Sequence, residues 1–122
     1  MKRTIAYVEE NADNRLLVSA ILGDRYRVAE YESGPAALAG FRRERPDLVL
    51  LDISMPEMDG TEVLRRMRAD AELAKVPVVA LTAHAMAGDR EKYLAEGFDG
   101  YVTKPIVDEE VLLDAIERHL GS

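Results

Sequence analysis

The stretch that decides the fold is Asp47-Leu-Val-Leu-Leu-Asp52-Ile-Ser-Met-Pro56-Glu-Met-Asp59-Gly60. Its four consecutive apolar residues, 48–51, are typical of a strand buried on both faces, as in a parallel sheet. The run ends on Asp52, and Pro56 with the pair Asp59-Gly60 indicates a loop after it. We therefore expect Asp52 at the carboxyl end of a central strand, the edge at which open parallel sheets bind ligands.

The composition is that of a single globular domain, 1–122, in which 48% of the residues are hydrophobic and 32% are charged. No apolar run approaches the length of a bilayer crossing, and the apolar stretch near the N-terminus is too short for a signal peptide. The absence of cysteine excludes a disulfide framework and thiol chemistry. A net charge of −7 argues against direct nucleic-acid binding. The expected location is the cytoplasm.

Strands and helices are predicted to alternate along the whole chain. Besides the central strand, short apolar runs predict strands at 4–8, 26–32, 77–81 and 100–103. Capping residues and helical spacing predict five helices. The first follows a cap at Asn11 or Asp13 and ends at Gly23-Asp24, the second opens at Ser33-Gly34-Pro35, the third runs from the cap Asp59 to about 69, the fourth spans about 86–96, and the last starts near Asp108. The charged strand at 26–32 is expected at a sheet edge. This alternation indicates an α/β fold, with helices on both faces of a parallel sheet.

Helical spacing also predicts which side chains face the core. The predicted inward faces are Leu16, Leu17, Ala20 and Ile21; Ala37, Leu38 and Phe41; Val63, Leu64 and Met67; and, in the last helix, Val111, Leu112, Ala115, Ile116 and Leu120.

Polar residues follow four of the five strands, namely Glu9-Glu10, Asp52, Thr82 and Lys104. Because parallel strands point the same way, these residues are expected to converge on one rim of the sheet. Crowded carboxylates are tolerable around a divalent cation, and few oxygen ligands shared with phosphate and water suit Mg²⁺. A lysine supplies a point charge for phosphate, and a threonine hydroxyl can hydrogen-bond a phosphoryl oxygen. In these surroundings Asp52 can act as a nucleophile and form an acyl phosphate.

Four motifs in order resemble the receiver domain of two-component response regulators, and the resemblance covers essentially the whole chain. They are Tyr7-Val-Glu-Glu10, Leu51-Asp-Ile-Ser-Met-Pro-Glu-Met-Asp-Gly60, Leu81-Thr-Ala83 and Gly100-Tyr-Val-Thr-Lys-Pro105. The resemblance implies a flavodoxin-like (βα)5 sandwich, with a five-stranded parallel sheet in the order 2-1-3-4-5. The chain resembles single-domain regulators of the chemotaxis type, and the stretch Thr82-Ala-His-Ala-Met-Ala-Gly-Asp-Arg-Glu91 looks most like receivers of hybrid kinases and stand-alone single-domain regulators.

The resemblance also implies the chemistry of the rim. Asp52 would accept a phosphoryl group from a sensor histidine kinase or a histidine phosphotransfer protein. Mg²⁺, or Mn²⁺ in its place, would be held by Glu10, the Asp52 carboxylate and the Ser54 main-chain carbonyl, with Glu9 contributing through water. Such a domain assists its own phosphorylation and dephosphorylation and is not a conventional turnover enzyme.

Switching residues follow from the same resemblance. Lys104 would contact the phosphoryl group, Thr82 would swing toward it, and Tyr101 would turn inward on activation. The Lys104-Pro105 peptide is expected to be cis. The new charge would bias the face built from the fourth helix, fifth strand and fifth helix, which would act on a separate effector protein. The protein is expected to be a monomer or a weak phosphorylation-dependent dimer.

One position departs from the family pattern, and it leaves an alternative open. Receivers usually carry aspartate where this chain has Glu10, and the longer side chain is expected to reach deeper into the crevice. A receiver that no longer switches and acts as a docking module is therefore a second hypothesis. An aspartyl-phosphate phosphohydrolase would need a general acid where Ser54 stands. A flavin binder is disfavoured because Glu9-Glu10-Asn11 would repel a phosphate.

Overall fold

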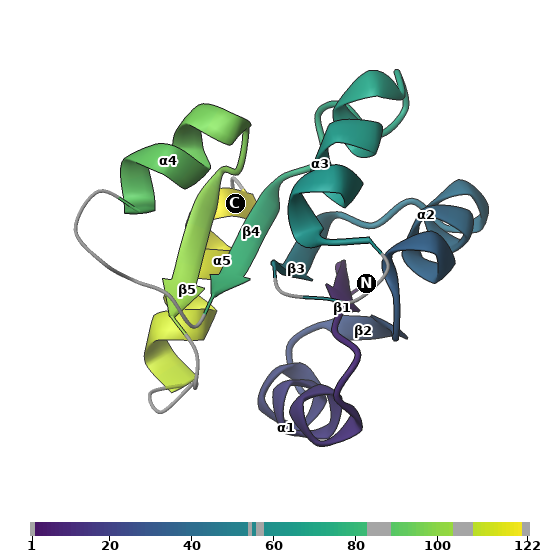
Figure 1. Ribbon diagram of the computed structural model, residues 1–122. Coiled ribbons are helices and arrows are strands. Elements are labelled where there is room, and N and C mark those ends of the chain that lie inside the picture. Colours follow the sequence, from purple (N-terminus) through teal and green to yellow (C-terminus); the bar gives the residue numbers. More distant parts are fainter. Residues whose placement is uncertain (1, 54, 56–57, 83–88, 104–108, 121–122) are drawn as a thin grey trace.

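The computed structural model describes residues 2–53, 55, 58–82, 89–103 and 109–120. In this part of the chain one parallel sheet has the strand order β2-β1-β3-β4-β5, which confirms the predicted topology (Figure 1). The strands are β1 (Thr4–Val8), β2 (Arg27–Tyr31), β3 (Leu48–Asp52), β4 (Val78–Thr82) and β5 (Gly100–Thr103). The helices are α1 (Ala12–Leu22), α2 (Gly34–Arg43), α3 (Gly60–Ala69), α4 (Asp89–Glu96) and α5 (Glu109–Leu120).

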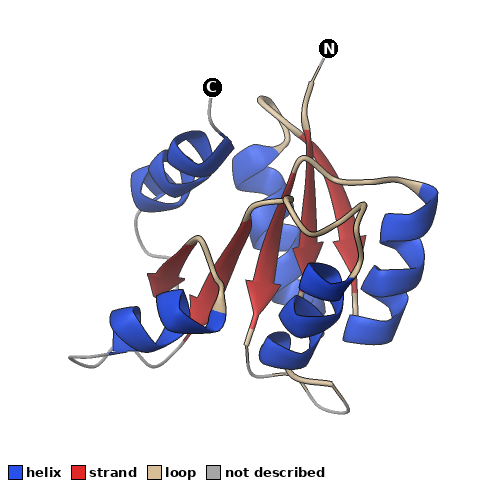
Figure 2. Cartoon of the chain, turned by 90° about the horizontal axis from the view of Figure 1, so that it is seen from above, coloured by secondary structure: helices blue, strands red, loops and turns tan. Residues whose placement is uncertain are grey.

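Helices cover both faces of the sheet, so the domain has three layers (Figure 2). Successive side chains of β1 and β3 point to opposite faces. Ala6 and Val49 pack into the core under α2, α3 and α4, whereas Ile5 and Leu48 pack into the core under α1 and α5. Residues 48–51 are fully buried, as expected for the central strand, and β2 lies at an edge of the sheet. None of the helices in the described ranges is long and apolar enough to cross a membrane.

Side-chain caps begin three of the helices where the sequence predicted them. The side chains of Asn11, Ser33 and Asp59 each accept a hydrogen bond from a main-chain N–H in the first turn of α1, α2 and α3. Pro35 lies in the first turn of α2, where its missing N–H costs nothing. The predicted start of the fourth helix at 86 and the residue Asp108 lie outside the described residues.

The predicted inward face of α1 is wrong for three of its four residues, and only Ile21 packs against the core as predicted. Leu16 and Leu17 are 71% and 47% exposed, and Ala20 is also exposed. Val18 and Leu22 are the residues of α1 that are buried. Residues 16–18 and 20–22 are all apolar, so helical spacing alone could not select the side that faces the sheet.

The side of α1 that faces the sheet also makes polar contacts with β2. The Arg15 side chain pairs with Glu30 at 3.5 Å, and the Ser19 hydroxyl donates to Glu30 at 2.8 Å. Residues 15, 18, 19 and 22 share one helical stripe, so the side of α1 that makes these contacts also buries Val18 and Leu22 and leaves Leu16 and Leu17 outward.

A smaller error concerns α5. Val111 was predicted to face inward but is 52% exposed, while Leu113 is buried at 6% exposure. Leu112 and Ile116 are buried as predicted. Residues 111–113 are all apolar, and which two of them pack is decided by how α5 lies on β3, β4 and β5.

Candidate functional site

The predicted rim brings together buried polar side chains from neighbouring strands. Glu9, Asp52 and Thr82 are only 2%, 4% and 2% exposed. Val8 is in register with Leu51, and Asp52 is in register with Leu81, so β1, β3 and β4 end side by side. Buried carboxylates are costly unless they are hydrogen-bonded or paired. Packing alone therefore does not explain why Glu9 and Asp52 are buried at this rim. The predicted residues Ser54, Lys104 and Pro105 lie outside the described residues.

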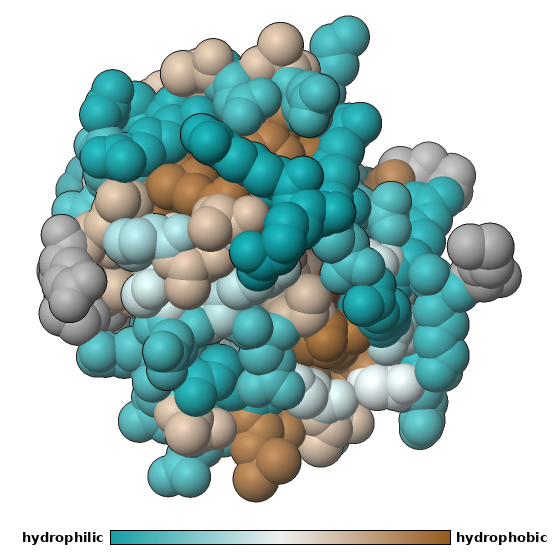
Figure 3. Space-filling model, turned by 90° about the vertical axis from the view of Figure 1, so that its right-hand side faces the viewer, coloured by the Kyte–Doolittle hydropathy of each residue, from teal (hydrophilic) through white to brown (hydrophobic). Residues whose placement is uncertain are grey.

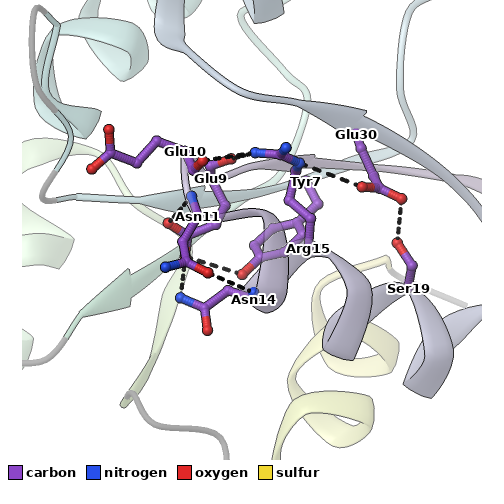
Figure 4. Close-up of polar contacts among 8 residues, drawn as sticks. All are labelled: Tyr7, Glu9, Glu10, Asn11, Asn14, Arg15, Ser19 and Glu30. Atoms are coloured by element: carbon purple, nitrogen blue, oxygen red, sulfur yellow. Dashed lines mark hydrogen bonds and ion pairs between the residues drawn. The ribbon is translucent and has the colours of Figure 1, made fainter.

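The Glu9 carboxylate is held by donors from β1 and the start of α1 (Figure 4). The Tyr7 hydroxyl donates to Oε1 at 3.3 Å, and the Asn14 side-chain amide donates to the same oxygen at 3.2 Å. The main-chain N–H of Asn11 donates to Oε2 at 3.4 Å. Burial raises the pKa of Tyr7, and the negative charges of Glu9 and Asp52 raise it further.

Arg15 fixes the loop that joins β1 to α1. Its Nη1 donates to the main-chain carbonyl of Glu9 at 2.6 Å and to that of Glu10 at 3.0 Å. The Glu10 side chain is exposed and points away from Glu9 in Figure 4. Its extra methylene therefore carries the carboxylate outward in this structure, and not deeper into the rim as expected from the sequence.

Gly60 lets α3 begin directly against the backbone that carries Asp52. Its N–H donates to the carbonyl of Ile53 at 3.0 Å. A Cβ atom at Gly60 would lie 2.8 Å from both the Asp52 carbonyl oxygen and the Ile53 Cα. The preceding residue, Asp59, caps α3, and a hydrogen bond from the Thr61 hydroxyl lowers the pKa of its carboxyl. The requirement for glycine thus comes from close packing against the backbone of Asp52 and Ile53.

Thr82 is connected to α4 through a tyrosine that the sequence reading did not single out. The hydroxyl oxygens of Thr82 and Tyr93 are 3.1 Å apart and share a buried hydrogen bond in which either group can donate. The ring of Tyr93 lies 6.1 Å from that of Tyr101, measured between centroids, at an angle of 50°. Tyr101 is partly buried. The sequence feature that could have pointed to this contact is Tyr93 itself, a tyrosine within the predicted fourth helix.

The described residues supply only part of the oxygen ligands that a magnesium ion needs. There, no group of three acidic or histidine side chains is close enough to hold a metal ion. Mg²⁺ needs only one or two protein carboxylates, because water and phosphate oxygens complete its shell. Asp52 is a buried carboxylate at the end of β3, and Glu9 is buried after the neighbouring strand β1, so the described rim offers carboxylates of this kind.

Residues 5–117 match the family described as the response regulator receiver domain. The chain belongs to this family. It is 37% identical to the polar-differentiation response regulator DivK of Brucella anthropi over 122 residues, covering 99% of this chain and 98% of DivK. It is also 43% identical over 108 residues to the sensor protein GacS of Pseudomonas syringae, covering 85% of this chain but only 12% of GacS.

Solved receiver structures agree with this assignment. The receiver domain of the sensor histidine kinase PA1611 from Pseudomonas aeruginosa superposes with a TM-score of 0.89, at 35% identity over the whole of both chains. That structure has a magnesium ion coordinated in its active-site cleft. The chemotaxis protein CheY4 of Vibrio cholerae also gives a TM-score of 0.89, at 28% identity, covering 98% of this chain and 99% of CheY4. The receiver fold is thus shared along the full chain.

Proposed function

We propose that this receiver domain is a phosphorylation-activated switch whose acceptor is Asp52. The observation that carries the proposal is the burial of Asp52 at a strand end, between the strands that end at Glu9 and Thr82. An Asp52 carboxylate oxygen would attack the phosphorus of a phosphohistidine. The phosphorus–nitrogen bond would break, its electron pair would return to the imidazole, and an acyl phosphate would remain on Asp52.

The proposed metal ligands are the carboxylates of Glu10 and Asp52 and the main-chain carbonyl of Ser54, with Glu9 acting through water. To bind the ion, the Glu10 side chain would turn inward from the outward position that it has in Figure 4. A bound Mg²⁺ supplies positive charge that offsets the carboxylates and the phosphoryl oxygens, and Mn²⁺ would substitute for it. The magnesium ion in the PA1611 receiver supports this choice of metal. The three hydrogen bonds to Glu9 keep its carboxylate in place on the rim.

The proposed response begins at the phosphoryl group. Lys104 would pair with its oxygens, Thr82 would donate to one of them, and Tyr101 would turn inward. The face made by α4, β5 and α5 would then change its affinity for a separate effector protein. The short path from Thr82 through the Tyr93 ring to Tyr101 supports this direction of change.

We propose that the phosphodonor, a sensor histidine kinase or a histidine phosphotransfer protein in the cytoplasm, docks on α1. This helix follows the rim directly and exposes Leu16, Leu17 and Ala20. Figure 3 shows apolar side chains protruding at the lower edge of the molecule, at the level of α1 in Figure 1. Exposed large apolar side chains gathered on one helix are typical of a protein–protein contact. Direct binding to nucleic acid is not part of the proposal, and dimerisation would be weak and would follow phosphorylation.

The test is intact-mass measurement after incubation with Mg²⁺ and acetyl phosphate. A single phosphoryl adduct should form in the wild type and should require the metal. It should be absent from Asp52→Asn and present in Asp24→Asn, a matched change at an exposed aspartate. An adduct on Asp52→Asn would contradict the assignment.

No adduct on the folded wild type would favour the docking-module alternative. The outward direction of the Glu10 side chain is the observation that supports this alternative. Glu10→Asp would then show whether the residue at this position is the cause.

A further inference from the structure

Tyr93 occupies an enclosed position between the phosphorylation rim and the α4 side of the domain. Its side chain is 6% exposed, and its hydroxyl shares the buried 3.1 Å hydrogen bond with Thr82. The ring packs edge-on against Phe98, with centroids 6.1 Å apart and planes at 88°. It also contacts the Tyr101 ring at 6.1 Å. These contacts hold the Tyr93 hydroxyl in place relative to β4.

We propose that Tyr93 is a positioning residue that keeps the Thr82 hydroxyl turned toward α4 in the unphosphorylated protein, and that it thereby opposes phosphorylation of Asp52. This inference rests on the proposed function, because it assigns a resting-state restraint to the same site. It also assigns Tyr93 as the link through which movement of Thr82 reaches Tyr101 and α4.

The hydroxyl group of Thr82 is the part of the rim that Tyr93 contacts directly. Whichever hydroxyl donates, the bond keeps the Thr82 oxygen 3.1 Å from the Tyr93 oxygen, so the bond breaks when the Thr82 side chain turns its oxygen toward a phosphoryl group on Asp52. The backbone of Thr82 is paired with Thr103 of β5, and its neighbour Leu81 is paired with Asp52 of β3. Because β4 is held on both sides, the hydroxyl must reorient by a step between staggered side-chain rotamers.

That reorientation has a cost in the resting protein. Turning the Thr82 oxygen toward Asp52 takes it away from the Tyr93 hydroxyl, which is buried and loses this partner. The net contribution of one buried hydrogen bond between neutral groups changes an equilibrium constant by about fivefold. The Thr82–Tyr93 hydrogen bond therefore shifts the resting population toward the arrangement that is not ready to stabilise a phosphoryl group.

The first experiment measures the initial rate of phosphorylation by acetyl phosphate with Mg²⁺, using intact mass. Tyr93→Phe keeps the ring and removes the hydroxyl, so the rate should rise about fivefold. Tyr26→Phe, the same change at a partly exposed tyrosine before β2, should match the wild type. With Thr82→Ala in the background, Tyr93→Phe should have no effect on the rate. An equal or lower rate in Tyr93→Phe alone would overturn the proposal.

A second experiment needs neither metal nor phosphodonor. Urea unfolding of the wild type, Thr82→Val, Tyr93→Phe and the double variant forms a double-mutant cycle. We expect a coupling of about fivefold in the unfolding equilibrium constant, and no coupling would overturn the proposal. Absence of an adduct on the wild type would instead overturn the proposed function, and the restraint with it. If the adduct forms equally fast with and without the Tyr93 hydroxyl, the proposed restraint is wrong while the proposed function stands.

Discussion

Tyr7→Phe tests whether the buried rim is held by the bond between Tyr7 and Glu9. Tyr7 is 1% exposed, and phenylalanine retains its packing, so the substitution removes little more than one hydroxyl group. That hydroxyl donates to a carboxylate, and such charge-assisted bonds contribute about 1.5–3 kcal/mol. The 3.3 Å distance and the further donors on Glu9 favour the lower end. We expect the free energy of unfolding to fall by about 1.5 kcal/mol.

The assay is urea unfolding at neutral pH, with Tyr26→Phe as the matched control. Tyr26→Phe should change the free energy of unfolding by less than about 0.5 kcal/mol, as is usual for surface positions. In a Glu9→Gln background the charge is gone, so Tyr7→Phe should cost less than it does in the wild type. Equal effects of Tyr7→Phe in the two backgrounds would refute the reasoning, as would equal effects at Tyr7 and Tyr26.

The burial of Tyr7 and its bond to Glu9 also predict that the stability of the folded protein falls at alkaline pH. Burial, followed by the charges of Glu9 and Asp52, raises the pKa of Tyr7 above the ordinary tyrosine value of 10.0. The folded protein thus keeps Tyr7 neutral at a pH where the unfolded chain ionises it. The stabilising contribution is complete below about pH 10 and is lost as the pH rises beyond it. Unfolding measured across this range should show a smaller alkaline loss of stability for Tyr7→Phe, and equal losses would contradict the assignment.

Three further predictions follow from the described contacts. Gly60→Ala places a methyl group 2.8 Å from the backbone at Asp52, so it should destabilise the protein by about 1–3 kcal/mol and slow phosphorylation by acetyl phosphate. The double change Leu16→Ser with Leu17→Ser should leave that reaction unchanged and slow phosphotransfer from a protein donor; equal slowing of both reactions would count against docking on α1. Two arginines in the same helix lower the pKa of Glu62 to about 2, so its stabilising contribution should be present above pH 4.5 and disappear as the pH falls toward 2. An NMR titration of Glu62 checks the pKa, and acid unfolding of Glu62→Gln checks the sign.

The sequence by itself determined the order of strands and helices and most of their ends. Local features carry this information, because a cap such as Asn11 or Ser33 acts within one turn and a short apolar run such as 48–51, bounded by breakers, is typical of a buried strand. It also placed Glu9, Asp52 and Thr82 on one rim, since the ends of parallel strands must meet there.

The tertiary structure alone decided which side of α1 faces the sheet and which groups touch the rim residues. The apolar residues 16–18 and 20–22 permit two orientations of α1, and the observed one buries Val18 and Leu22 while it brings Arg15 to Glu30 in β2. The bond between Thr82 and Tyr93 joins β4 to α4, across a gap of eleven residues that no local pattern spans. These features depend on how separate elements pack against each other, and packing is a property of the folded chain as a whole.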